Sequence, residues 1–316
     1  MPGTEGREMQ RRDFLSTVVA AAFVLPPSAA FAQQPRRIGL LRLALADAKQ
    51  LADIRQGLEE AGYAEGRNLV IDYRFAEGHY ARLPELAADL VRQNVEVIIT
   101  SGGISAVRAA MRATSTIPIV GTSVDPGRIA DPLVKHFNRP DGNVTGVSLI
   151  TGDLTAKRLQ MLAELVPGAA IGVLMNPTAT NHQRSREAIE EDGRTLQVKL
   201  VFAMVSTDAD LDPAFASLAG QHVGAILPEA EPFLGNNWRR LVPLADHYKV
   251  PMMQEWREAV EAGGLISYAP PLAWVGRQVG NYAGQILNGA KPADLPVVAP
   301  TRASLSSTWR PRRRSD

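Results

Sequence analysis

The chain has 316 residues, 45% of them apolar and 21% charged, and its formal net charge at pH 7 is +1. These values are ordinary for a globular protein, and they give no sign of the basic face that a nucleic-acid-binding protein needs. The absence of cysteine excludes disulfides, iron–sulfur clusters and thiol nucleophiles.

The first 32 residues have the three parts of an export leader. The paired Arg11 and Arg12 come first, an apolar run follows at 17–25, and Ala30-Phe31-Ala32 forms a small-x-small cleavage site. A membrane anchor needs about 20 apolar residues, so this run is too short to be one. We expect a signal peptide of the twin-arginine type at 1–32, cleaved after Ala32, and a mature protein in the periplasm; the general secretory route is the alternative.

Strand and helix patterns then alternate in two similar halves. The first half is predicted to contain strands at 37–41, 68–73, 95–100 and 117–120 and helices at 47–62, 80–93 and 104–113. The second is predicted to contain strands at 170–175, 198–204, 223–227, 250–253 and 264–268, helices at 153–166, 180–194, 212–221 and 238–248, and a closing helix at 272–288. This alternation predicts an α/β fold whose parallel sheets are covered on both faces.

The two halves begin alike. IGLLRL near residue 40 matches IGVLMN near residue 173, which indicates a duplicated architecture, and the Pro- and Gly-rich stretch 125–144 suits a crossover. The expected organisation is lobe one at 36–125, a crossover or hinge region at 126–152, lobe two at 153–268, closing helices and a return segment at 269–305, and a disordered basic tail at 306–316.

Ser101-Gly102-Gly103 is a candidate ligand-binding turn. It follows a buried strand and opens a helix, so its amides are placed to bind an anion or a carboxylate. It lacks the three-glycine dinucleotide signature, and a plain strand-to-helix turn is the alternative.

Two acidic segments also follow strands. Glu229 and Glu231 form a pair that suits acid–base chemistry, an ammonium site or a solvated turn. Residues 254–257 supply amide, acid, aromatic and guanidinium groups, the mix that binds polar small molecules, although Trp256 packed between helices is the plain alternative.

Metal and hydrolase chemistry are not indicated. The five histidines are scattered without a second ligand at helical spacing, and the sequence has no G-x-S-x-G elbow. We therefore expect no metal, no cofactor and no catalytic residue.

Four phrases together resemble one family. They lie at 142–169, 223–233, 250–270 and 286–301, and the likeness runs from about residue 36 to 305. The chain resembles the exported solute-binding proteins of ABC uptake systems, of the kind linked to aromatic amino-acid import. The resemblance implies a type I periplasmic binding protein architecture, with two flavodoxin-like (Rossmann-like) lobes, a hinge, and a ligand clamped between the lobes.

The resemblance also implies site positions. The residues that it places around the ligand are Leu43, Ser101, Gly102, Gly103, Thr122, Ser123 and Asp125 from lobe one, and Asn176, Pro228, Glu229, Gln254 and Tyr268 from lobe two. Gly102 and Gly103 would offer amides to a ligand carboxylate, and an acid such as Asp125 or Glu229 would hold an ammonium group.

The expected function is capture of a small polar organic solute, such as an amino acid, by a monomer that delivers it to an ABC permease. No nucleic acid is expected as a partner. The alternatives are a sensory partner of a receptor and an exported hydrolase or isomerase that uses Glu229 or Glu255. The chain departs from the family where a strand and a helix usually follow, and its polar end is expected to leave an apolar face of lobe two uncovered.

Overall fold

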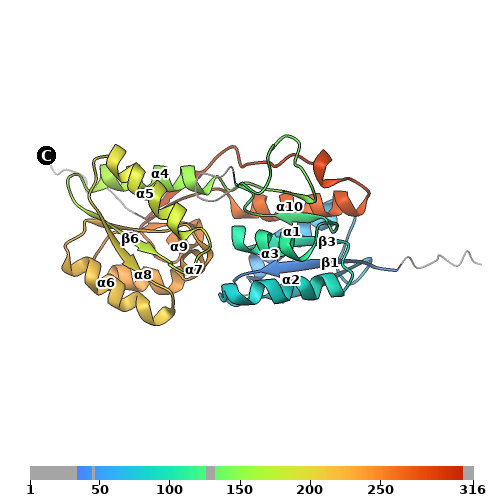
Figure 1. Cartoon of the computed structure of the whole chain (residues 1–316). Helices are drawn as coiled ribbons and strands as arrows, with labels where there is room; N and C mark the ends of the chain where they lie inside the picture. Colours follow the sequence, from blue (N-terminus) through green and yellow to red (C-terminus); the bar gives the residue numbers. More distant parts are fainter. Residues whose placement is uncertain (1–33, 45–46, 126–131, 309–316) are drawn as a thin grey trace, which may run out of the picture. The chain divides into compact units, whose positions relative to one another are not determined.

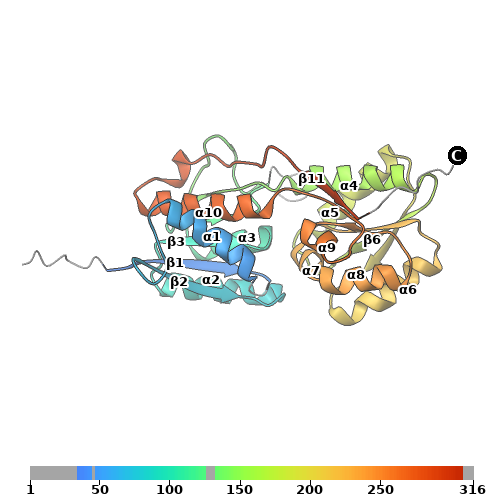
Figure 2. The same cartoon turned by 180° about the vertical axis from the view of Figure 1, so that it is seen from behind.

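The computed structural model describes residues 34–44, 47–125 and 132–308, so the predicted leader and residues 309–316 lie outside the described part. The described residues from 35 onward form one compact unit. Within it the chain builds two α/β lobes, each with a sheet between two layers of helices (Figures 1 and 2). The predicted fold class is confirmed.

The first lobe is built on a five-stranded parallel sheet. Its strands, in spatial order, are β2 (Leu69–Phe75), β1 (Arg36–Arg42), β3 (Val97–Ser101), β4 (Ile119–Gly121) and β5 (Val144–Gly146). Its helices are α1 (Ala48–Glu60), α2 (Leu83–Arg92), α3 (Ile104–Ala113) and α10 (Leu272–Leu287). Helices α1 and α10 cover one face of the sheet, and α2 and α3 cover the other.

The second lobe repeats this plan. Its strands form two three-stranded sheets, which a bridge between Ile226 and Met252 joins edge to edge. In spatial order they are β7 (Leu200–Met204), β6 (Ile171–Met175) and β8 (Ala225–Pro228), then β9 (Met253–Gln254), β10 (Ile266–Ala269) and β11 (Ser304–Ser307). Its helices are α4 (Thr151–Leu165), α5 (His182–Thr195), α6 (Leu211–Gly220), α7 (Pro232–Asn236), α8 (Trp238–His247) and α9 (Arg257–Glu261). Helices α4 and α5 cover one face, and α6 and α8 cover the other.

The similar phrases that begin the two halves have the same structural role. A Cβ on Gly39 would lie 2.8 Å from Leu90 Cδ1, and a Cβ on Gly172 would lie 2.9 Å from Leu218 Cδ1. In each lobe, therefore, the glycine of the first strand lets a helix leucine pack directly against the backbone of the sheet. The matching phrases therefore correspond to the same packing of a helix leucine against a strand glycine in both lobes.

Helix α10 differs from expectation. The sequence predicted that it closes the second half, yet it packs on α1 in the first lobe. Its glycines explain this position: a Cβ on Gly280 would lie 2.1 Å from Ile54 O, and a Cβ on Gly276 would lie 2.7 Å from Asp53 Cβ. The two helices thus approach closely enough for backbone contact, which larger residues would prevent.

The chain passes between the lobes three times in the described part. The connections are residues 147–150, 270–271 and 299–303. Two of them start side by side, because Val147 and Val298 form a parallel bridge and Val298 accepts from Ser148 N at 2.8 Å. The sequence predicted one crossover region, at 126–152.

The end of the described chain also differs from expectation. Residues expected to run into a disordered tail form β11, which pairs antiparallel with β10. Backbone hydrogen bonds do not require apolar side chains, so a polar serine-rich segment can complete a sheet edge. Leu305 on this strand remains 54% exposed.

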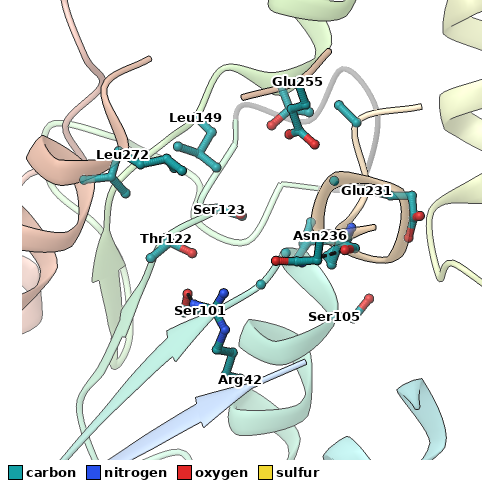
Figure 3. Close-up of a pocket in the computed structure, with 18 of the residues that line it drawn as sticks. Arg42, Ser101, Ser105, Thr122, Ser123, Leu149, Glu231, Asn236, Glu255 and Leu272 are labelled. Atoms are coloured by element: carbon teal, nitrogen blue, oxygen red, sulfur yellow. Dashed lines mark hydrogen bonds between the residues drawn. The ribbon is translucent and has the colours of Figure 1, made fainter. Parts of the chain in front are cut away.

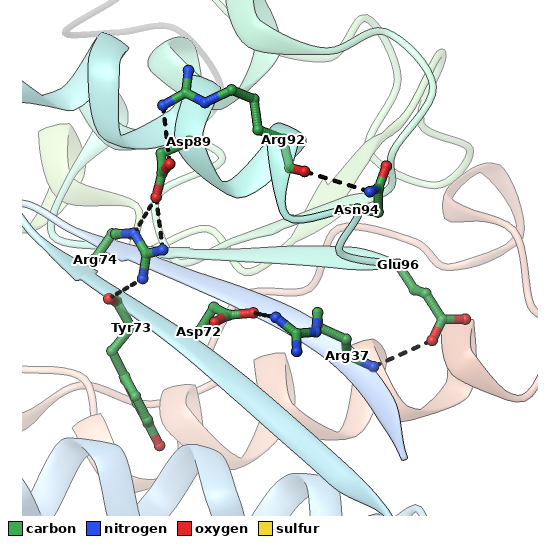
Figure 4. Close-up of polar contacts among 8 residues, drawn as sticks. All are labelled: Arg37, Asp72, Tyr73, Arg74, Asp89, Arg92, Asn94 and Glu96. Atoms are coloured by element: carbon green, nitrogen blue, oxygen red, sulfur yellow. Dashed lines mark hydrogen bonds and ion pairs between the residues drawn. The ribbon is translucent and has the colours of Figure 1, made fainter. Parts of the chain in front are cut away.

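Ion pairs tie β1, β2 and α2 together at the outer part of the first lobe (Figure 4). Arg37 pairs with Asp72 at 3.0 Å, and Asp89 accepts from Arg74 at 2.6 Å and from Arg92 at 2.9 Å. The bond from Arg74, aided by Arg92, lowers the pKa of Asp89. Solvent-exposed pairs of this kind contribute little to stability, so they adjust this surface and do not hold the fold.

Candidate functional site

A pocket of about 120 Å³ is lined by residues of both lobes (Figure 3). It lies where β1, β3 and β4 end and where the segments after β8 and β9 begin, the place where α/β sheets bind ligands. Its polar lining residues are Arg42, Gln50, Tyr80, Ser101, Ser105, Thr122, Ser123, Asp125, Thr151, Asn181, Glu231, Asn236 and Glu255. Its larger apolar lining residues are Ile54, Ile104, Leu149, Trp256, Leu272 and Val275.

The first lobe supplies the positive side of the pocket. Arg42 is the last residue of β1 and is only 2% exposed. One of its terminal nitrogens donates to Gln50 Oε1 at 2.5 Å and to Ser101 Oγ at 3.3 Å. Burial lowers the pKa of Arg42, and the charge of Asp47 opposes this shift. The arginine nevertheless stays charged at neutral pH. Its buried charge therefore favours an anionic group in this part of the pocket.

The turn after β3 lies beside Arg42. Gly102 and Gly103 have φ values of 92° and 91°, which non-glycine residues rarely adopt, and Gly103 caps α3. The first N–H groups of a helix have no partner inside it, so this turn presents donors next to the guanidinium. A Cβ on Gly103 would lie 2.7 Å from Pro232 Cγ of the second lobe. Glycine is thus required both for the turn and for the approach of the lobes.

The second lobe supplies the acidic side. Glu231 caps α7 by accepting from Leu234 N at 2.6 Å and Phe233 N at 3.0 Å. It also accepts from Asn176 Nδ2 at 3.3 Å and from Tyr80 Oη of the first lobe at 2.6 Å. Burial raises the pKa of Glu231, and these bonds oppose the shift.

Glu255 is the second acid on this side. It follows β9, lines the pocket, and lies against α7, where a Cβ on Gly235 would be 2.4 Å from Glu255 Oε2. Burial raises its pKa to about 7, with Arg158 lowering it and Glu231 raising it further. Glu255 is therefore poised to be ionised by a cationic group that enters the pocket.

Asp125 lines the pocket but is also bound to the first connection between the lobes. Its carboxylate accepts from Ser148 Oγ at 2.7 Å and from Thr151 Oγ1 at 3.2 Å. Burial raises its pKa, and these bonds oppose the shift. Ile150, between its two partners, has a left-handed φ of 45°, a conformation that costs about 1–2 kcal/mol. Asp125 thus supports a strained segment at the junction of the lobes.

Two more polar contacts join the lobes near the pocket. Ser105 Oγ lies 2.8 Å from Thr180 Oγ1, and Lys49 Nζ lies 3.2 Å from Glu258 Oε1. Together with the bond from Tyr80 to Glu231, they link the rims of the two lobes.

Half of the site residues expected from the sequence line the pocket. These are Ser101, Gly102, Gly103, Thr122, Ser123 and Asp125, all from the first lobe. Leu43 is buried and lies directly behind the turn: a Cβ on Gly102 would be 3.3 Å from Leu43 Cβ. The ligand contacts themselves stay predictions.

The expected residues of the second lobe lie behind the pocket. Pro228, Glu229 and Gln254 line a separate small cavity of about 10 Å³, which is enough for about one water molecule. Asn176 is buried, and its backbone N–H donates to Glu229 Oε2 at 3.3 Å. Tyr268 is half-buried against the α4 side of the sheet.

Several residues that line the pocket were not predicted from the sequence. Arg42, Gln50, Tyr80, Asn236, Leu272 and Val275 were not singled out. An arginine at the end of a buried strand is a signal that could have identified Arg42. Leu272 and Val275 reach the pocket only because α10 returns to the first lobe, which no local pattern indicates.

In residues 34–44, 47–125 and 132–308, no cluster of three or more histidine, aspartate or glutamate side chains is placed to hold a metal ion. Among the helices of the same part, none has the length and apolar character that crossing a membrane requires.

Comparison with known proteins identifies the family of this chain. Its model, described as ABC transporter substrate binding protein, matches residues 46–305. The tyrosine-binding protein of Clostridioides difficile (strain R20291) is 27% identical over 246 residues, which are 77% of this chain and 69% of that protein.

Two solved structures are similar over most of their length. A conserved domain protein from Vibrio cholerae O1 biovar El Tor has a TM-score of 0.76 and 26% identity, covering 87% of this chain and 92% of that chain. The ABC domain in complex with L-Trp from Streptococcus pneumoniae has a TM-score of 0.75 and 23% identity, covering 86% and 91%. The second likeness shows a shared fold.

Proposed function

This chain belongs to the family of ABC transporter substrate-binding proteins, and we propose that it binds an α-amino acid as a zwitterion between its lobes. The family makes it a binding protein with a small-molecule ligand and an ABC permease as partner, and not an enzyme. Glu229 and Glu255 therefore receive no catalytic role.

One observation carries the proposal: a single pocket contains a buried cation from one lobe and an ionisable acid from the other. Arg42 and the turn at Gly102 and Gly103 suit the ligand carboxylate. Glu255, with Glu231 nearby, suits the ammonium group. Because the two charges come from different lobes, a zwitterion favours the state in which the lobes are together.

The third side of the pocket suits an apolar side chain. Ile54, Leu149, Leu272 and Val275 line it, and Trp256 adds an aromatic surface. Relatives described as tyrosine-binding and as a complex with L-Trp support an aromatic amino acid as the ligand class.

Calorimetric titration with matched analogues tests this proposal. L-tyrosine or L-tryptophan should bind, whereas tyramine and 3-(4-hydroxyphenyl)propionate, which lack the carboxylate and the ammonium respectively, should bind roughly 10- to 100-fold more weakly, since a hydrogen bond to a charged group contributes about 1.5–3 kcal/mol. Glu255→Gln should abolish the preference for L-tyrosine over the propionate, while Glu85→Gln, on the exposed part of α2, should not. Equal binding of all three compounds would refute the zwitterion site.

We also propose that the protein acts in the periplasm as a monomer. The predicted leader supports export, and the two lobes of a single chain supply both the cationic and the acidic side of the pocket. The mature protein purified from its host should begin at Gln33 and have the mass of one chain by light scattering. Lysines in place of Arg11 and Arg12 should block export by the twin-arginine route and leave secretory export intact.

A further inference from the structure

Arg158 is a buried cation in the second lobe, behind the acidic side of the pocket. It lies on α4, is 3% exposed, and does not line the pocket itself. Its Nε donates to Tyr268 O at 2.8 Å, and a terminal nitrogen approaches Glu255 O at 3.5 Å. A buried charge without a compensating partner is strongly unfavourable. In the described part of the chain, Glu255 is the acid that acts electrostatically on Arg158.

Two further acids of the second lobe lie near Glu255. Glu231 precedes α7 and repels a charge on Glu255, and Glu229 at the end of β8 is itself affected by Glu255. From β10 the neighbouring titratable group is Tyr268, whose carbonyl is held by Arg158. Three carboxyl groups thus share one small region, and among the described residues Arg158 is the cation that opposes the raised pKa of Glu255 there. Without it, a proton would bind to Glu255 and remove the charge that faces the pocket.

We infer that Arg158 is a positioning residue that favours the carboxylate form of Glu255 in the pocket and thereby strengthens the pocket's selectivity for ligands with a cationic amino group. This inference rests on the proposed function for the identity of the ligand. Arg158 acts through Glu255, since it does not line the pocket, and its bond to Tyr268 O orients the guanidinium beneath the segment that carries Glu255.

The test compares Arg158→Gln, which removes the charge and keeps an N–H donor, with Arg158→Lys, which keeps the charge. The affinity for L-tyrosine is measured from pH 5.5 to 8.5. The wild type should bind about tenfold more weakly for each pH unit below 7, because Glu255 is then protonated. Arg158→Gln should move this profile upward by at least one pH unit, losing roughly tenfold at pH 7 and recovering at pH 8.5, while Arg158→Lys should follow the wild type. An equal loss at every pH would identify a merely structural role and overturn the inference.

A measurement without ligand separates this inference from the proposed function. Carboxyl ¹³C NMR of glutamate-labelled protein, with Glu255→Gln for assignment, gives the pKa of Glu255 directly. The signal should titrate at least one pH unit higher in Arg158→Gln than in the wild type; an unchanged midpoint would refute the role of Arg158. If Arg158→Gln does not fold, the same comparison uses Arg158→Met in a sample whose thermal melt shows a cooperative transition. If the titration shifts as expected but no amino acid binds the wild type, the proposed function fails and the charge assignment stands.

Discussion

The hydrogen bond from Tyr80 to Glu231 is predicted to contribute to ligand affinity through contact between the lobes. Tyr80 Oη donates to the carboxylate at 2.6 Å; Glu231 is buried and Tyr80 is partly buried. Tyr80→Phe leaves a buried carboxylate with one donor fewer, and a hydrogen bond to a charged group contributes about 1.5–3 kcal/mol. If this bond forms only when the lobes are together, ligand affinity should fall by roughly 10- to 100-fold.

Two matched variants isolate the effect of lobe contact. Tyr63→Phe also removes a tyrosine hydroxyl bond, to Asn288 Oδ1 at 2.9 Å, but both partners belong to the first lobe. It should lower the free energy of unfolding by about 1 kcal/mol and leave affinity unchanged. Thr180→Val removes the bond to Ser105 at the other rim, where Thr180 does not line the pocket, and should weaken binding severalfold.

Calorimetry at pH 8 and chemical denaturation of the ligand-free protein measure these quantities. An affinity of Tyr80→Phe within twofold of the wild type would show that the bond is equally present without ligand. If Tyr63→Phe weakened binding as much as Tyr80→Phe, the loss would come from general destabilisation, and the argument from lobe contact would be wrong.

Two further predictions concern stability. Gly280→Ala should lower the free energy of unfolding by about 3 kcal/mol or more, because the new Cβ would lie 2.1 Å from Ile54 O. In the control Gly220→Ala the new Cβ has nothing within 4 Å, so the free energy of unfolding measured in urea should stay the same or rise by up to about 1 kcal/mol. Similar losses in both variants would contradict the packing of α10 on α1. Glu229 is 2% exposed, and burial raises its pKa from 4.5 to about 8. Between these pH values the folded state holds a proton that the unfolded state releases. The free energy of unfolding should therefore fall as the pH rises from about 5 to 8, by at most about 1.4 kcal/mol per pH unit. Glu229→Gln should reduce this slope and be more stable than the wild type at pH 8, whereas an unchanged slope would show that Glu229 titrates normally; Glu85→Gln is the control.

Much of the fold could be predicted because strands and helices leave periodic patterns in the sequence. The alternation of elements from 37 to 268 is found nearly as expected, and the paired phrases at residues 40 and 173 correspond to equivalent strands. Short elements were missed: β5, α7 and α9 have three to five residues, too few to show a period.

The candidate site could be predicted only in part. Local pattern identified the turn at 101–103, because a glycine pair between a buried strand and a helix is visible in the sequence. The pairing of Tyr80 with Glu231 joins residues 151 positions apart, and the positions of Glu229 and Asn176 behind the pocket depend on how β6 and β8 end. No local signal encodes such distances.

The sequence by itself determined that the chain builds two α/β units, and that neither uses cysteine chemistry. Only the tertiary structure decided that α10 returns to the first lobe, that residues 304–307 complete the second sheet, and that Arg42 and Glu255 line one pocket. The physical reason is that secondary structure follows from contacts within a few residues. A pocket between lobes depends instead on where three separate connections bring distant strand ends.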